Sequence, residues 1–195
     1  MDFPFFLRNI GLGAGLAMDA SAVSISNGFH EPTMKKGKHL LISFLFALFQ
    51  AAMPLAGYFA GHALLQYIEP YIPWIALALL VALGIKMIID GVKERKAQKE
   101  DKEEKPKPLT LGVLLVQAVA TSIDALSVGL TISDYTIPEA LVAVTLIFAV
   151  TFCLCLLAVW LGKKGGTKLG WRAVIVGGVI LIAIGIEICL SGLLG

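Results

Sequence analysis

Long apolar runs separated by short polar segments dominate the chain. Each run is about 20 residues long, the length a helix needs to cross a hydrocarbon core near 30 Å thick. Backbone groups in lipid must be satisfied within the segment, and the runs are too long for barrel strands of about 10 residues, so each run is predicted to be a helix. The predicted spans cover residues 3–27, 40–61, 71–91, 109–131, 139–162 and 172–194. The expected fold is an all-α integral membrane protein with six transmembrane helices.

The first predicted span differs from a cleavable secretory signal. Asp2 stands where a basic leader would be, and Asp19 interrupts the apolar run. The run also exceeds the apolar core of a signal peptide, which is about 7 to 15 residues long. We therefore expect this span to be a retained helix.

Composition agrees with a membrane protein and excludes several other classes. Hydrophobic residues make up 57% of the chain and charged residues 15%, with a mean hydropathy of +0.84, whereas soluble domains carry about 25% charged residues. The net charge of +2 gives no global basic excess for nucleic acid. The three cysteines include no CxxC pair, so neither a disulfide framework nor a zinc spacing is expected.

Lys and Arg are concentrated in every second loop between the predicted spans. Residues 62–70 and 133–138 contain no Lys or Arg. Because cytoplasmic loops accumulate Lys and Arg, we expect the three basic segments to be cytoplasmic and both termini to lie outside. Acidic residues are interleaved in the segment 93–108, which is expected to be a solvated linker. The basic segments carry Lys35, Lys36 and Lys38; Lys93, Arg95, Lys96, Lys99, Lys102, Lys105 and Lys107; and Lys163, Lys164, Lys168 and Arg172.

The two halves of the chain resemble each other. LAMDASAVS (16–24) aligns with TSIDALSVG (121–129), and ALGIKMIIDG (82–91) aligns with AIGIEICLSG (183–192). The repeats are predicted to span residues 1–92 and 109–195, on either side of the linker 93–108. Three crossings are an odd number, so the second copy must enter the membrane from the opposite side. Transporters with such inverted repeats place the substrate near the bilayer midplane, between the repeats.

Ionisable residues within the predicted spans include Asp19, Lys86, Asp90, Asp124 and Glu187, and such a residue costs roughly 2.5 to 3.5 kcal/mol at a helix centre. Asp19 and Asp124 each lie about 14 residues into a span, roughly 21 Å along a helix, and so near the midplane. We predict both as metal ligands, and Glu187 and Asp90 as further ligands or proton carriers. Lys86, four residues before Asp90, is either its ion-pair partner or a counter-charge for the empty site.

The other polar residues on these faces favour a hard cation. No histidine is expected at depth, and the cysteines are not placed to act together, so a soft-metal or imidazole site is not expected. Carboxylate, amide and hydroxyl oxygens suit magnesium, calcium or manganese. An alternative is that the aspartates only bond serines across a helix pair. The predicted supporting residues are Ser26, Asn27, Gln50, Gln117, Thr121 and Ser127.

Three motifs resemble the MntP manganese efflux pump family of the lysine-exporter superfamily: MDASAVSISNG (18–28), LGIKMIIDG (83–91) and SIDALSVGL (122–130). The resemblance covers essentially the whole chain. It implies a six-helix protein of the bacterial inner membrane that exports Mn²⁺, with Asp19, Asp124 and Asp90 as functional positions. The family often has a Glu in the second helix where this chain has Gln50, which removes one carboxylate.

The sequence thus predicts a secondary transporter, not an enzyme, that exports Mn²⁺ in exchange for protons. Mn²⁺ is expected as cargo, with no resident cofactor, and the partners are the lipid bilayer, the divalent ion and protons, without nucleic acid. The alternative within transport is export of another small cation, either a different divalent metal or a cationic amino acid, which needs a roomier site. A thiol redox protein would need a reactive cysteine pair, and a scaffold would tolerate neutral residues at both aspartates.

Overall fold

The computed structural model describes residues 2–68, 71–99, 108–169 and 171–194, and all regular structure in these ranges is α-helical. The helices are α1 (Phe3–His30), α2 (Lys36–Ile68), α3 (Ile72–Lys99), α4 (Leu111–Ser122), α5 (Ala125–Thr131), α6 (Ile137–Leu169) and α7 (Trp171–Leu194). Five of the six predicted spans correspond to one helix each. Among the residues that the structure describes, two helical stretches are long and apolar enough to cross a membrane, Lys36–Ala60 and Ile137–Gly166, and two shorter apolar stretches are Leu111–Ser122 and Val174–Glu187.

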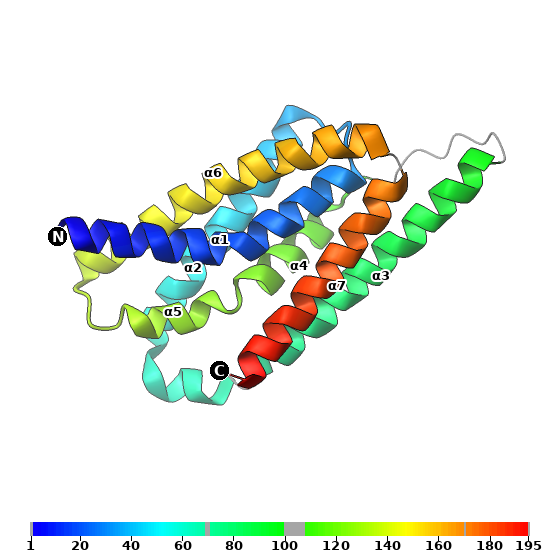
Figure 1. Ribbon diagram of the computed structural model, residues 1–195. Helices are drawn as coiled ribbons and strands as arrows, with labels where there is room; N and C mark the ends of the chain where they lie inside the picture. The colour runs from blue at the N-terminus through cyan, green and yellow to red at the C-terminus, as the bar shows by residue number, and fades with distance from the viewer. Residues whose placement is uncertain (1, 69–70, 100–107, 170, 195) are drawn as a thin grey trace.

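The fourth span was predicted as one helix, and this prediction is wrong. The helix ends at Ser122 and resumes at Ala125, so α4 and α5 run in different directions (Figure 1). Thr121 Oγ1 donates to Gln117 O at 2.9 Å, and Ser122 Oγ donates to Ala118 O at 2.6 Å. Such back-bonding hydroxyls compete with the helix ladder and bend it. The carboxylate of Asp124 then accepts the backbone N–H of Ala125, as a cap does.

Local capping sets two other helix starts. Thr110 accepts the N–H of Val113 through its side chain at the start of α4. At the start of α6, Glu139 Oε2 accepts both the N–H of Thr136 at 2.9 Å and its hydroxyl at 2.7 Å. This is the arrangement of a capping box, in which the third helical residue reaches back to the cap.

The helices pack as two extensive pairs, α1 against α6 and α3 against α7, with α2 lying against α6 and α5 (Figure 1). Small residues bring several of the backbones into contact. A Cβ on Gly28 would lie 2.7 Å from Gly162 Cα, and one on Gly129 would lie 2.6 Å from Gly57 Cα. Small residues at such crossings permit the close approach typical of helices in membranes. The core between the pairs is apolar and includes Ile42, Phe46, Leu80, Leu114 and Leu181.

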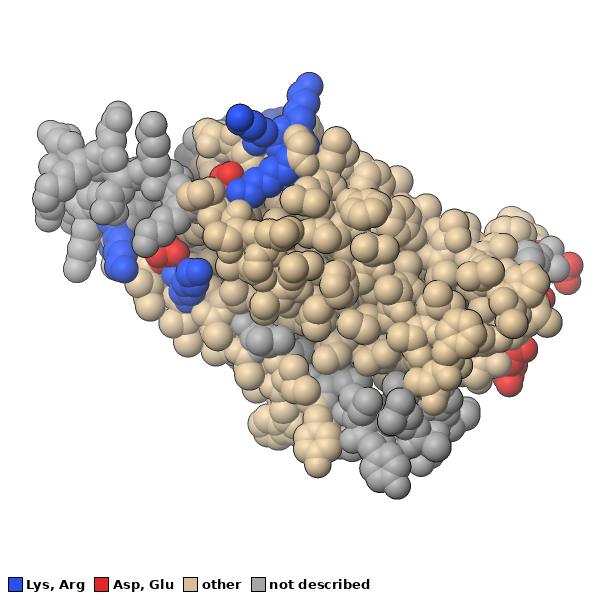
Figure 2. All heavy atoms as spheres, turned by 180° about the vertical axis from the view of Figure 1, so that it is seen from behind, with Lys and Arg blue, Asp and Glu red and all other residues tan. Residues whose placement is uncertain are grey.

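The outer surface of the bundle has a broad uncharged belt around its middle. Met18, Phe59, Trp160 and Leu157 are among the large apolar side chains that are more than half exposed. Figure 2 shows this belt between one end of the molecule, where Lys and Arg lie beside a few acidic side chains, and an opposite end, where the charged side chains visible on this face are acidic. A large exposed apolar surface of this kind fits contact with lipid.

Candidate cation site

Asp124 lies in the break between α4 and α5 and is half-buried. One of its oxygens accepts the N–H of Ala125. The other, Oδ1, is buried and has no hydrogen-bond partner. A buried carboxylate oxygen without a partner is costly, and either a cation or a proton would compensate it.

Asp19 on α1 faces the same region. It is half-buried, and its carboxylate is close enough to that of Asp124 for the two to repel each other. Glu187 on α7 acts on Asp19 in the same way, although its own side chain is exposed. Within the described ranges, no three His, Cys, Asp or Glu side chains lie close enough to hold one metal ion together. The pair Asp19 and Asp124 is therefore the acidic centre, and Glu187 stands beside it.

Neutral oxygens accompany this pair. Gln50 on α2 is fully buried, and its Nε2 donates to Leu16 O of α1 at 3.1 Å. Its Oε1 is buried without a partner. Thr121, buried on α4, precedes Asp124 by three residues and bonds back to its own helix. Ser127 lies one turn beyond Asp124 on α5 and is half-buried.

The remaining predicted residues lie farther along the bundle. Ser26 Oγ donates to Met87 Sδ of α3 at 3.3 Å, so this hydroxyl joins two helices. Asn27 Nδ2 donates to Gln117 Oε1 at 2.9 Å, which joins α1 to α4. Both amides are buried.

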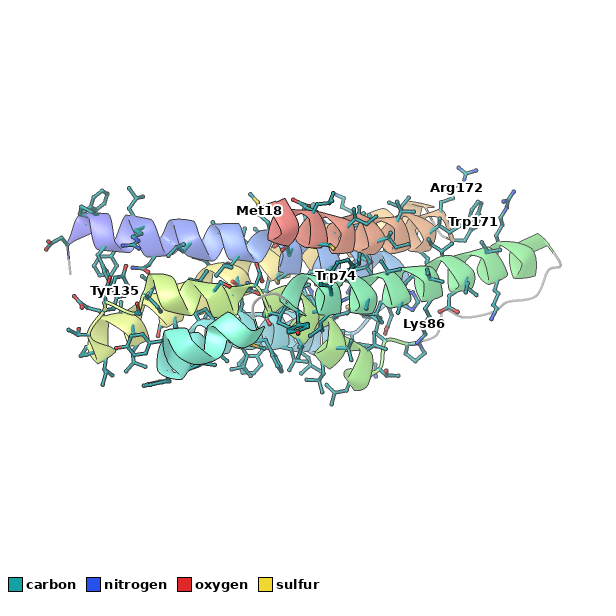
Figure 3. All side chains as sticks on the ribbon, turned by 90° about the horizontal axis from the view of Figure 1, so that it is seen from below. Met18, Trp74, Lys86, Tyr135, Trp171 and Arg172 are labelled. Atoms are coloured by element: carbon teal, nitrogen blue, oxygen red, sulfur yellow. The ribbon has the colours of Figure 1, made fainter. Side chains whose placement is uncertain are left out.

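Asp90 and Lys86 belong to a separate cavity of about 130 Å³ between α1, α3 and α4, called here the α1–α3–α4 cavity. Lys86 is exposed, lies on the same half of the molecule as Trp171 and Arg172 (Figure 3), and forms no ion pair with Asp90. The ion pair considered for these two residues is therefore not formed. The polar residues that line the cavity are His30, Lys86, Asp90, Thr110 and Gln117.

Sequence reasoning missed His30 as a lining residue. It is the last residue of α1 and is only 6% exposed, so it is enclosed by the bundle although it adjoins a loop. Its place at the end of the MDASAVSISNG stretch was the one available signal.

Comparison with known proteins places this geometry in context. Residues 33–189 match the protein family described as "Putative manganese efflux pump". A protein of Ruminiclostridium cellulolyticum named "Putative manganese efflux pump MntP" is 45% identical over 177 residues, which cover 91% of each chain. The chain belongs to the MntP family.

Other MntP relatives match over similar lengths. A protein of that name from Gloeothece citriformis is 43% identical over 93% of each chain, and one from Clostridium botulinum, "Putative manganese efflux pump MntP 2", is 40% identical over 91% of this chain. No solved structure gives a significant match. Family membership and the apolar helices together identify a membrane protein.

These matches confirm the resemblance to the MntP family that the three sequence motifs indicated.

Gln50 has a defined role in this chain, because its amide nitrogen donates to the α1 backbone. An ionised Glu at this position has no donor and would leave Leu16 O without that bond. The amide therefore holds α1 against α2 and still presents one free oxygen toward the interior.

Proposed function

We propose that this protein is a secondary transporter that exports Mn²⁺ from the cytoplasm, with Asp19 and Asp124 as the central metal ligands. The observation that carries the proposal is the unpartnered, buried Oδ1 of Asp124 at a helix break, next to a second half-buried aspartate. Discontinuous helices at repeat interfaces are a common way for transporters to build an ion site. Relatives of this chain are named manganese efflux pumps, which supports the choice of ion.

The available donors suit a hard divalent ion. The donors are two carboxylates, the free amide oxygen of Gln50 and the backbone carbonyl of Gln50. That carbonyl lacks its helical hydrogen bond, because Pro54, four residues later in α2, has no N–H to donate. Mn²⁺ accepts carboxylate, amide and carbonyl oxygens. Glu187, beside Asp19, and Asp90, in the α1–α3–α4 cavity, would serve along the path to and from the centre.

The α3–α7 pair supports an inverted repeat with domains 1–92 and 109–195. A Cβ on Gly84 would lie 2.6 Å from Gly178 O, and one on Gly185 would lie 3.6 Å from Leu77 Cα. Gly185 follows Gly84, and Gly178 follows Leu77, by the same 101 positions. A two-fold axis between the halves would relate the two contacts to each other, which supports an inverted repeat.

Proton exchange is the coupling that the charges favour. Two carboxylates that repel each other in a low-dielectric site need either a metal ion or protons to compensate them. Metal binding would release protons, and protonation on the other side would release the metal. Lys86 forms no ion pair with Asp90, and its place on the cavity wall suits a counter-charge.

The test measures intracellular manganese in bacteria that lack their own exporter. The intact protein is expected to lower it, and Asp19→Asn and Asp124→Asn, at equal membrane abundance, are expected to abolish that effect because each removes a charged ligand. Asp134→Asn, the same change at an exposed loop position, is the matched control.

Unchanged manganese with the intact protein would refute Mn²⁺ export, and full activity of both central variants would refute the aspartate centre. In inverted vesicles, an imposed proton gradient is expected to drive Mn²⁺ uptake. Uptake that ignores the gradient would remove proton exchange from the proposal.

A further inference from the structure

The α1–α3–α4 cavity ends at a buried pair of amides. Gln117 lines the cavity and is 1% exposed, and its Oε1 accepts the hydrogen bond from Asn27. Asn27 is 0% exposed, and its own Oδ1 has no hydrogen-bond partner. Asn27 reaches the cavity only through Gln117, which lines it. An amide oxygen that is buried without a partner is a preformed acceptor, because desolvation has already occurred.

The amide pair stands between the cavity and the aspartates. Gln117 lies five residues before the end of α4 at Ser122, about 7.5 Å along the helix. Asp124 lies two residues beyond that end, in the break before α5. Asn27 follows Asp19 by eight residues, about 12 Å along α1. The amides are therefore too far from the aspartate centre to share one ion with it.

The charges that face the cavity favour weak binding of a cation. Asp90 supplies one negative charge and Lys86 one positive charge, and His30 adds an imidazole at the end of α1. A volume of about 130 Å³ corresponds to roughly four waters at about 30 Å³ each, so an ion can enter with part of its hydration shell. Sites on a conduction path must bind weakly enough to release the ion onward.

We propose that Asn27 Oδ1 and Gln117 Oε1 form a threshold site, at which a divalent cation from the α1–α3–α4 cavity exchanges hydration waters for amide oxygens before it reaches the aspartates. The proposal rests on the proposed export function and extends it to a second, uncharged site. Gln117 Oε1 has a second lone pair for the cation, but the N–H of Asn27 that faces this oxygen would turn its positive end toward the ion, so loading is expected to break the Asn27–Gln117 hydrogen bond. The two amides thus both bind the cation and close the cavity from the aspartate centre.

The test is protection of a cysteine in the cavity from alkylation. Leu83→Cys, on the half-buried cavity wall of α3, is introduced into protein that carries Ala at Cys153, Cys155 and Cys189. N-ethylmaleimide labelling is followed as Mn²⁺ is titrated. At an Mn²⁺ concentration about five times Kd, labelling is expected to slow about sixfold, since the fraction of protein without bound ion falls by the factor 1 + [L]/Kd.

Variants separate the threshold site from other sites. Asn27→Ala is expected to abolish protection. Asn9→Ala is the control, because Asn9 is also a fully buried α1 amide with an unpartnered Oδ1 but bonds Phe5 O, far from the cavity. Asp124→Asn is expected to leave protection in place, because the threshold oxygens remain.

The outcomes also separate this proposal from the export function. Absence of protection in the parent, or protection that survives Asn27→Ala, would overturn the threshold site even if Mn²⁺ is exported. Protection that depends on Asn27 would uphold the site even if transport fails. In proteoliposomes, Asn27→Ala is expected to raise KM for Mn²⁺ about tenfold, whereas a purely structural amide would lower the amount of folded protein and leave KM unchanged.

Discussion

At the scale of single residues, glycine decides how closely the helices approach. Gly28 on α1 and Gly162 on α6 meet backbone to backbone, and Gly57 and Gly129 do the same for α2 and α5. The second contact involves α5, which begins directly after Asp124. Packing of these glycines therefore helps to fix the position of the aspartate.

Gly28→Ala is expected to destabilise the protein. The new methyl group would lie 2.7 Å from backbone atoms of Gly162, Val159 and Lys163, which cannot move aside as a side chain can, and overpacking of this kind costs about 1 to 3 kcal/mol. Gly11→Ala on the same helix has no atom within 4 Å of the new Cβ and should retain or raise the melting temperature, since Ala favours helices. Melting of purified protein in detergent checks both, and equal melting temperatures would contradict this packing.

Single residues also show what sequence could predict. Asp19 and Asp124 were found because a charge within an apolar run is conspicuous, and the structure brings these two together. The separation of Asp90 from them was not predictable, because hydropathy places a residue at a depth but not against a particular neighbour. His30 was missed for the same reason, since it is buried at the end of α1 and lines a cavity with residues of α3 and α4, which its own segment does not reveal.

At the scale of elements, one carboxylate ties together segments that are distant in sequence. Glu31, just after α1, forms an ion pair with Lys38 of α2, and its Oε2 also accepts the N–H of Leu109 at 2.8 Å. Lys163 of α6 donates to Met34 O in the same loop at 2.7 Å. Leu109 begins the second half of the chain and lines the α1–α3–α4 cavity. Glu31 therefore holds one wall of the cavity.

Glu31→Ala is expected to lower stability more than Glu31→Gln. Alanine removes both interactions, and a hydrogen bond to a charged group contributes about 1.5 to 3 kcal/mol. Glutamine still accepts from Leu109 and loses only the ion pair, which at this partial exposure contributes about 1 kcal/mol or less. Lys38→Met, which also removes only the ion pair, should match Glu31→Gln. Thermal melting ranks the three variants, and an alanine variant as stable as the glutamine variant would show that the Leu109 bond contributes nothing.

The helix bounds show the limit of pattern reading for elements. Five spans were predicted as single helices, because a long apolar run is enough to indicate one. The bounds are less accurate, since α2, α3 and α6 continue seven or eight residues beyond the predicted ends into polar or loop sequence that hydropathy does not assign to a helix. The break at Ile123 and Asp124 was not predicted, because residues 109–131 contain no proline and only one charged residue. The hydroxyls of Thr121 and Ser122 that bend α4 are visible in the sequence, but their bonding to the preceding turn is a choice of rotamer that only the fold reveals.

At the scale of the whole molecule, the two ends of the bundle carry different charged side chains. Tyr135 lies at the end opposite Trp171 and Arg172 (Figure 3), next to the exposed Asp134. Around Trp171, the guanidinium groups of Arg95 and Arg172 lie 4.9 and 5.5 Å from the ring centroid. Aromatic and basic side chains together are typical of the cytoplasmic membrane interface.

Loading from the cytoplasm requires the basic end of the bundle to face the cytoplasm, and a labelling experiment tests this orientation. In protein with Ala at the three native cysteines, Lys35→Cys in the α1–α2 loop is expected to react with a membrane-impermeant maleimide only in inverted vesicles. Ser133→Cys, exposed in the loop before α6, is expected to react only in intact cells. The reason is that cytoplasmic loops retain positive charge and the loop at Ser133 has none. The α1–α3–α4 cavity is bounded by Leu109 and Thr110 at the basic end, so this orientation opens it to the cytoplasm, where an exporter must load. The reverse labelling would place the cavity on the outer side and would contradict loading of the cation from the cytoplasm.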